Sequence, residues 1–307
     1  MSVCRASVSV TRPSQPSRII RLILLAGLIA ASGGACATGA LSGPQGLAVA
    51  APIQEGRVIT YKVRNEDVQG YLVRPERAES APGIVVIHEW WGLNDQIKHV
   101  ADRLAEDGYM AIAVDLYRGK LGTDAGLAHE LMRGLNENWA VDVVSGAVAQ
   151  LRAIEARERP ALKGSARTRM PIGTIGFCMG GRISLATALA GADVQAAVMY
   201  YGSVETDKGA LAPLAVPLLG IYGNEDRGIP LDQIRAFQTA LKEAGKDATV
   251  LVYPGVGHAF FNEERPSYDA EAAKDSWERT RMFLRKNLTP EAAGAAPPAR
   301  RPGPELP

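Results

Sequence analysis

The sequence predicts an α/β fold in which a mainly parallel central sheet of about eight strands has helices on both faces. Two observations between residues 53 and 288 predict this fold. Short apolar runs alternate along the chain with segments whose apolar residues recur at helical spacing. The runs are apolar at every position rather than at every second one, as is typical of parallel strands buried on both faces.

The expected strands fall into two groups. Residues 57–63 and 68–74 flank the polar turn 64–67 and predict an antiparallel hairpin. The expected parallel strands are residues 83–87, 110–114, 172–177, 196–200, 218–222 and 250–253. The expected helices are residues 97–104, 139–154, 183–189, 234–241 and 277–288. Because crossovers between parallel strands are right-handed, we expect the functional loops at the carboxyl ends of these strands.

The composition favours one soluble-type domain that acts on a small molecule. Of the 307 residues, 47% are hydrophobic, which is enough for one large core, and we expect this domain over residues 51–290. The 34 Lys and Arg residues nearly balance the 33 Asp and Glu residues, so no basic field exists to hold nucleic acid. We expect a monomer. The Ala- and Pro-rich residues 291–307 show no periodicity and predict a disordered tail.

Residues 1–50 predict a signal peptide and leader. Four arginines and no acidic residue precede the apolar run 22–31, which is too short to span a bilayer. We therefore expect an exported protein, either periplasmic or secreted. Small residues at 35–37 and at 48–50 suit ordinary cleavage, whereas a lipobox ending at Cys36 would give a lipoprotein with a lipid anchor. An uncleaved membrane anchor is the remaining alternative.

Cys178 is the one cysteine expected in the mature domain, because Cys4 and Cys36 lie in or beside the signal peptide. A disulfide framework is therefore excluded. Residues 176–181 read Gly-Phe-Cys-Met-Gly-Gly and lie between an apolar strand and a helix. This G-x-nucleophile-x-G pattern is typical of the tight turn that carries the nucleophile of α/β-hydrolases, and a helix N-terminus there would favour a thiolate. The alternative is a buried structural cysteine in a glycine-rich turn.

Two further residues complete a candidate catalytic triad. Asp226 follows one buried strand and His258 follows the next, so both lie on loops at carboxyl ends of strands. The order nucleophile, acid, histidine is that of α/β-hydrolases. His258 would exchange protons with the sulfur and the leaving group, while Asp226 would fix its tautomer. Glu225 is the alternative acid.

The other histidines favour no metal site. His99 and His129 lie in polar helical surroundings and are most simply surface side chains, while His88 ends a strand and suits a core or supporting position. No pair has a metal-ligand spacing such as H-x-x-x-H. We therefore expect neither a metal nor an organic cofactor.

Residues 88–94 follow the strand 83–87, where this fold places the second donor of its oxyanion hole. By position, the backbone N–H groups of Trp90 and Met179 would form that hole. Glu89 is a carboxylate at the end of an apolar strand, which predicts a paired or functional group. A helix-capping or surface carboxylate is the alternative. Trp91 suits either the wall of a pocket or core packing.

Across residues 53–288, the chain resembles the dienelactone hydrolases, or carboxymethylenebutenolidases. The matching pieces are residues 88–94, 115–118, 176–181, 200–202, 223–226 and 257–260. The resemblance implies that Cys178, Asp226 and His258 are the triad and that Glu89 helps to deprotonate the cysteine as substrate binds. It also implies that Arg118 grips a carboxylate on the substrate, with Tyr117 and Trp91 beside it.

The sequence departs from the family at Asn262. After the Gly-His-x-Phe motif, the resemblance leads us to expect a second substrate-binding arginine, and Asn262 occupies the matching position. An asparagine cannot form the bidentate contact that an arginine makes with a carboxylate. Arg265 lies close by in the sequence and is a candidate substitute. The exact substrate is therefore open, although a carboxylated ester or lactone is one candidate.

The function predicted from the sequence is hydrolysis of a carboxylic ester or lactone through a thioester on Cys178. One alternative is a binding protein that keeps the fold without turnover. The other is a thiol redox enzyme, which normally needs a second, resolving cysteine.

Overall fold

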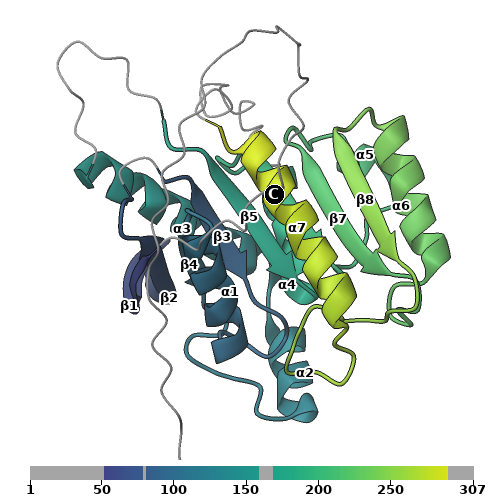
Figure 1. Ribbon diagram of the computed structural model, residues 1–307, viewed down its shortest axis with the longest axis horizontal. Helices are drawn as coiled ribbons and strands as arrows, with labels where there is room; N and C mark the ends of the chain where they lie inside the picture. Colours follow the sequence, from purple (N-terminus) through teal and green to yellow (C-terminus); the bar gives the residue numbers. More distant parts are fainter. Residues whose placement is uncertain (1–51, 79–80, 159–168, 290–307) are drawn as a thin grey trace, which may run out of the picture. The chain divides into compact units, whose positions relative to one another are not determined.

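The computed structural model describes residues 52–78, 81–158 and 169–289. The predicted signal peptide with Cys36, and the predicted tail at 291–307, lie outside these residues. The strands described are β1 (Ile53–Val63), β2 (Glu66–Pro75), β3 (Gly83–Ile87), β4 (Met110–Val114), β5 (Ile172–Phe177), β6 (Ala196–Tyr200), β7 (Leu218–Gly223) and β8 (Ala248–Tyr253). They form one sheet in the order β1-β2-β4-β3-β5-β6-β7-β8 (Figure 1).

The sheet is mainly parallel, as the sequence predicted. β1 and β2 form the expected antiparallel hairpin, and β2 also pairs antiparallel with β4. All of the pairs from β4 through β3 and on to β8 are parallel. This mainly parallel sheet with helices on both faces is the α/β-hydrolase fold, which confirms the predicted fold class.

The helices cover the two faces of the sheet. They are α1 (Asp95–Glu106), α2 (Ala125–Gly134), α3 (Glu137–Glu158), α4 (Met179–Leu189), α5 (Lys208–Leu211), α6 (Leu231–Glu243) and α7 (Ala270–Asn287). Ile84 and Val86 of β3 belong to the apolar cluster that includes α1 and α7, the two helices in front of the sheet in Figure 1. Val85 and Ile87 point the opposite way, into a cluster with α3. Alternate residues of one strand thus supply both cores.

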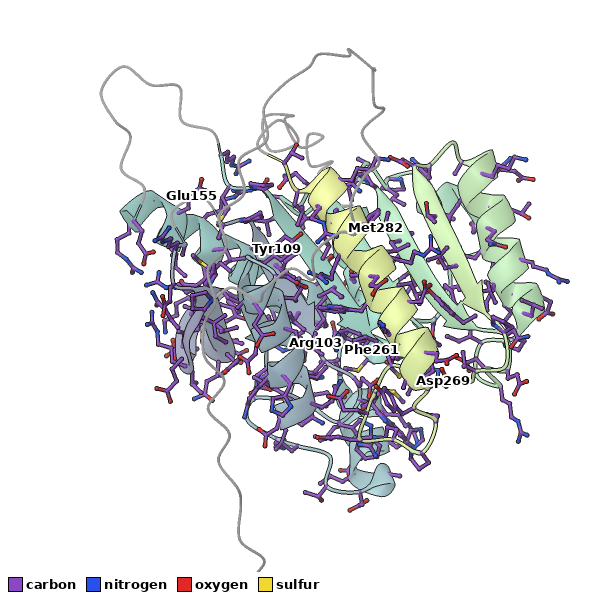
Figure 2. The ribbon with its side chains drawn as sticks, viewed as in Figure 1. Arg103, Tyr109, Glu155, Phe261, Asp269 and Met282 are labelled. Atoms are coloured by element: carbon purple, nitrogen blue, oxygen red, sulfur yellow. The ribbon has the colours of Figure 1, made fainter. Side chains whose placement is uncertain are left out.

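Cation–π contacts join α1 to α7 and to the segment just before it, on the face of the sheet that these helices cover. Arg103 of α1 lies close to Phe261, which precedes α7 (Figure 2), and its guanidinium carbon is 5.4 Å from the centre of that ring. The same guanidinium is 4.4 Å from the ring of Trp277 on α7. A cation over aromatic faces adds electrostatic attraction to the apolar packing between α1 and α7.

Helices α2 and α5 were not expected from the sequence, and α4 and α7 begin earlier than expected. The sequence did not predict α2, although Asp124 caps it by accepting a hydrogen bond from the Leu127 amide at 3.0 Å. The helix expected from residue 277 starts at Ala270 instead, where Asp269 accepts from the Ala272 amide at 2.8 Å. Its first turns bury small residues, so they lack the large apolar side chains on which helical periodicity relies.

The parallel strands bring the predicted site residues to one edge of the sheet. Glu89 follows β3, Cys178 follows β5, Asp226 follows β7 and His258 follows β8, each just beyond the carboxyl end of its strand. Within the described ranges, we find no helix long and apolar enough to cross a membrane.

Helix α7 offers a matched test of the front core. Leu284 is fully buried and Met282, two residues earlier on the same helix, is 60% exposed (Figure 2). We predict that Leu284→Ala lowers the free energy of unfolding by about 2–5 kcal/mol, because it removes buried methyl groups and leaves a cavity. Met282→Ala should change it by less than about 0.5 kcal/mol. Urea unfolding of both variants measures the difference, and equal losses would contradict this packing.

Candidate active site

Cys178 lies on a tight turn between β5 and α4, with φ of 53° and ψ of −118°. Residues with a side chain rarely adopt a positive φ, so the surrounding structure must hold this conformation. Two glycines make the turn possible. A Cβ on Gly176 would lie 1.9 Å from the carbonyl oxygen of Gly180, and a Cβ on Gly180 would lie 2.3 Å from that of Ile87. The turn thus presents Cys178 at the N-terminus of α4, as the sequence predicted.

A chain of hydrogen bonds joins Asp226, His258 and Cys178. The Nδ1 atom of His258 lies 2.7 Å from Oδ2 of Asp226, and its Nε2 atom lies 3.1 Å from Sγ of Cys178. The other carboxylate oxygen of Asp226 accepts hydrogen bonds from the amides of Gly228 and Ile229. Both oxygens of this buried carboxylate are therefore satisfied. Glu225, the alternative acid, is exposed, and Asp226 is the carboxylate that contacts His258.

The site favours the charged form of His258. Burial alone lowers the pKa of this imidazole, but the hydrogen bonds to Asp226 and Cys178 outweigh it and raise the pKa to about 10. An imidazolium is thus stabilised between the aspartate and the sulfur. The sulfur of Cys178 therefore lies against a cationic imidazole, a setting typical of reactive cysteines.

Glu89 is fully enclosed and ties three loops together. Its Oε1 atom accepts a hydrogen bond from the Tyr201 hydroxyl at 3.1 Å, and its Oε2 atom accepts one from the Asn262 amide at 2.8 Å. Tyr201 follows β6 and Asn262 follows β8, so the carboxylate joins the ends of β3, β6 and β8. Burial raises the pKa of Glu89 because it removes the carboxylate from water, and this effect outweighs the two hydrogen bonds, which lower the pKa. Within the part of the chain that the structure describes, Glu89 makes its side-chain hydrogen bonds to Tyr201 and Asn262 and none to Cys178.

His88 is a buried residue that contacts the backbone after β3 and after β4. It is fully buried, and its Nε2 atom accepts a hydrogen bond from the Leu116 amide at 3.2 Å while Nδ1 contacts the carbonyl oxygen of Glu89. Burial lowers the pKa of His88 to about 4, so the ring is neutral at ordinary pH. His88 thus joins the ends of β3 and β4, which is the core position that the sequence suggested as one interpretation.

A pocket of about 370 Å³ opens at Cys178. Its described lining residues are Met132, Leu135, Glu137, Cys178, Met179, Arg182, Ile183, Tyr201, Ser203, Gly228, Ile229 and His258. Most of these are apolar, and they come from the end of α2, the start of α3, the first turns of α4 and the loops after β6, β7 and β8. A small organic molecule can therefore reach the sulfur and the imidazole together.

The structure does not bring the predicted substrate-binding residues to this pocket. Arg118 makes two hydrogen bonds to one carboxylate oxygen of Glu66 and lies over the ring of Trp139 at 4.3 Å, in a neighbouring cavity. Tyr117 lines that same cavity, although its hydroxyl reaches Sδ of Met179 at 3.3 Å. Trp91 and Asn262 are not among the described lining residues of the Cys178 pocket.

Asn262 occupies the sequence position of the expected arginine, and Arg265 is the arginine that lies close by in the sequence. The Arg265 guanidinium stacks on Trp91, 3.7 Å from the ring centre, and its positive charge lowers the pKa of Glu89 in opposition to burial. The Oδ1 atom of Asn262 accepts a hydrogen bond from the Glu264 amide, and its amide group donates to Glu89. Both ends of the Asn262 side chain are thus used within the protein.

Sequence reasoning missed three residues of the site. Tyr201 binds Glu89 and lines the pocket, and its position directly after a buried strand was an available signal. Arg182 lies four residues after Cys178, a spacing that puts both on one face of a helix. Glu137 bonds to Arg182 at 3.2 Å from the start of α3, and no local pattern connects these two residues.

Comparison with known proteins identifies the family. The model of the dienelactone hydrolase family matches residues 68–288. The chain belongs to the dienelactone hydrolase family. It is 34% identical over 230 residues to a protein of Methylorubrum extorquens named "Putative carboxymethylenebutenolidase", covering 71% of this chain and 77% of that one. It is 33% identical over 241 residues to "Protein usf" of Aquifex pyrophilus, covering 76% of this chain and all of that one.

A solved structure extends the likeness to three dimensions. A crystal structure of a protein of Klebsiella pneumoniae, described as "Putative Dienelactone Hydrolase", superposes with a TM-score of 0.65 at 28% identity. The match covers 76% of this chain and 99% of that one. Membership of this dienelactone hydrolase family makes the chain a hydrolase of the ester and lactone type, as the sequence predicted.

The raised pKa of His258 predicts a pH dependence of stability. Its folded-state pKa of about 10 lies above the ordinary value of 6.5. The stabilisation is therefore fully present below about pH 6.5 and is lost as the pH rises through about 10. Urea unfolding of the wild type and of His258→Gln should show a stability difference that shrinks over this range. A difference that stays constant or grows with pH would contradict the assignment.

Proposed function

We propose that the chain hydrolyses a carboxylic ester or lactone through a thioester formed on Cys178. The observation that supports this most strongly is the hydrogen-bond chain from Asp226 through His258 to the sulfur, at 2.7 Å and 3.1 Å. A nucleophile, a base within reach of it and a third group that orients the base are the parts that covalent acyl transfer needs. Cys178 and His258 line a pocket that fits a small organic molecule.

The first half of the reaction forms the acyl-enzyme. His258 holds the proton of Cys178, and the thiolate attacks the carbonyl carbon of the substrate to form a C–S bond. The tetrahedral intermediate collapses by breaking the C–O bond, and the leaving oxygen takes the proton from the imidazolium. For an ester this releases an alcohol, whereas for a lactone the hydroxyl stays attached to the acyl group.

The backbone amides of Trp90 and Met179 are the proposed oxyanion donors. Trp90 follows β3 and Met179 begins α4, and β3 pairs in parallel with β5, the strand that leads to Cys178. The two amides therefore come from neighbouring strand ends on the nucleophile's side of the sheet. Donors fixed in advance stabilise the negative charge that develops on the carbonyl oxygen without needing to reorganise.

The second half of the reaction frees the enzyme. Water donates a proton to His258 and attacks the thioester carbon, after which the C–S bond breaks. The products are a carboxylic acid and the regenerated thiolate and imidazolium pair. Asp226 keeps the Nδ1 atom of His258 occupied throughout, so that Nε2 always faces the reacting atoms.

Glu89 fits a positioning role in this proposal. Its carboxylate holds Tyr201 and Asn262 in place, and each of them belongs to a loop that carries part of the site. The ring of Tyr201 lies 5.1 Å from that of His258. Glu89 thus connects the loop of the oxyanion donor Trp90 with the loop of His258. This contact supports a task for Glu89 besides the deprotonation of cysteine that the resemblance implied.

The two alternative functions find less support. A thiol redox enzyme needs a second cysteine near the first, and Cys178 is the one cysteine of the described residues. A binding protein without turnover has no need for a strained turn that presents a thiol to a histidine and an aspartate.

Substitution of the nucleophile tests the proposal. We predict that Cys178→Ala lowers kcat on p-nitrophenyl esters by about 10³-fold or more, because no other group can form the acyl-enzyme. Cys178→Ser keeps a nucleophilic atom at the same turn and should retain more activity than Cys178→Ala. Release of p-nitrophenol by the purified proteins measures kcat. Equal melting temperatures of the variants and the wild type show that the substitutions leave the fold intact. Full activity in Cys178→Ala would overturn the mechanism.

A further inference from the structure

The pocket at Cys178 lacks a free positive charge. Of its described lining residues, Arg182 is the one arginine or lysine. His258 is also cationic, but its charge lies between Asp226 and the sulfur. A substrate that carried its own carboxylate would therefore depend on Arg182 for a partner inside this pocket.

Arg182 is already paired with two glutamates. Its Nε atom bonds to Glu137 at 3.2 Å, and its Nη1 atom lies 3.8 Å from a carboxylate oxygen of Glu205. The side chains of Arg182 and Glu205 are about three-quarters buried, while that of Glu137 is half exposed and lines the pocket itself. One positive and two negative groups leave this cluster with a net negative charge. An incoming carboxylate would meet repulsion there rather than a clamp.

The other candidate cations point elsewhere. Arg118 is bound to Glu66 and stacked on Trp139 in the neighbouring cavity. Arg265 is stacked on Trp91, and neither residue is among the described lining residues of the pocket. At the position where a second arginine was expected, the neutral Asn262 donates to Glu89. Neither Arg118 nor Arg265 is placed to hold a carboxylate beside Cys178.

The remaining wall is suited to an apolar acyl group. Met132, Leu135, Met179, Ile183 and Ile229 are apolar side chains among its described lining residues. Placing an unpaired carboxylate against such side chains removes it from water without a compensating contact, which is unfavourable. A hydrocarbon chain gains free energy in the same place, because its apolar surface is removed from water.

From these contacts we infer that the chain selects esters or lactones whose acyl part is uncharged and apolar, and that the Glu137–Arg182–Glu205 cluster enforces this choice. The inference rests on the proposed function, since it concerns the substrate of the same thiol. Arg182 is the specificity-determining residue, because its two glutamates decide whether it presents a free charge. Neutralising them converts the rim of the pocket into a carboxylate-binding site.

Two esters that differ in one group test the inference. p-Nitrophenyl hexanoate and mono-p-nitrophenyl adipate share the leaving group and the chain length, and only the adipate ends in a carboxylate. We expect the full-length wild type to cleave the hexanoate with kcat/KM at least about tenfold higher than the adipate. In Glu137→Gln/Glu205→Gln, the ratio of adipate to hexanoate kcat/KM should rise about tenfold, because Arg182 is released.

Two further variants keep this test specific. Glu243→Gln/Glu278→Gln removes two exposed glutamates from α6 and α7, far along the chain from the cluster, and should leave the wild-type ratio unchanged. Arg182→Gln should lower the adipate ratio further, since the two glutamates lose their cation. Its readout does not depend on the double variant being well folded.

The outcomes separate the inference from the proposed function. If the wild type cleaves the adipate as fast as the hexanoate, or if Glu137→Gln/Glu205→Gln leaves the ratio as it was, the inference is overturned while the thiol mechanism stands. If neither ester nor a neutral lactone is hydrolysed, the proposed function fails and the inference fails with it.

Discussion

The arrangement of this protein depends on how closely the turn at Cys178 approaches the strands on either side of it. The amide of Cys178 donates to the carbonyl of Tyr200 at the end of β6, and Gly180 lies against the carbonyl of Ile87 at the end of β3. Three strand ends are thereby held within reach of one another. Because a Cβ at Gly176 or Gly180 would collide with backbone, the nucleophile's position and the spacing of the loops are set by the same contacts.

The two buried carboxylates of the site, Asp226 and Glu89, differ in their hydrogen-bond partners. Asp226 is bound by two backbone amides and by His258, so both of its oxygens are satisfied where it holds the imidazole. Glu89 receives only the neutral Tyr201 and Asn262, and burial raises its pKa. One carboxylate thus orients the imidazole, and the other ties loops together. The neutral Asn262 contributes to this difference, since a guanidinium bonded to Glu89 would favour its charged form more strongly.

Much of this could be predicted from the sequence, because buried parallel strands, a glycine-flanked nucleophile and residues directly after strands leave local patterns. These patterns located Cys178, Asp226 and His258 at one edge of the sheet. The rest depends on contacts between distant segments. The start of α4 was missed because Gly180 and Gly181 are poor helix formers that close packing requires. No local pattern could show that Glu66 and Trp139 hold Arg118 in a neighbouring cavity, or that Glu137 neutralises Arg182.

The central claim is that the acyl group of the substrate is carried by the sulfur of Cys178. Intact-protein mass spectrometry after rapid acid quenching of the wild type with p-nitrophenyl hexanoate tests it most directly. We predict a transient mass increase equal to one hexanoyl group, located by peptide mapping on Cys178 and released by hydroxylamine, as a thioester is. Steady turnover in which the acyl group is found on another side chain, or on none under conditions that trap an acyl-enzyme, would contradict the account.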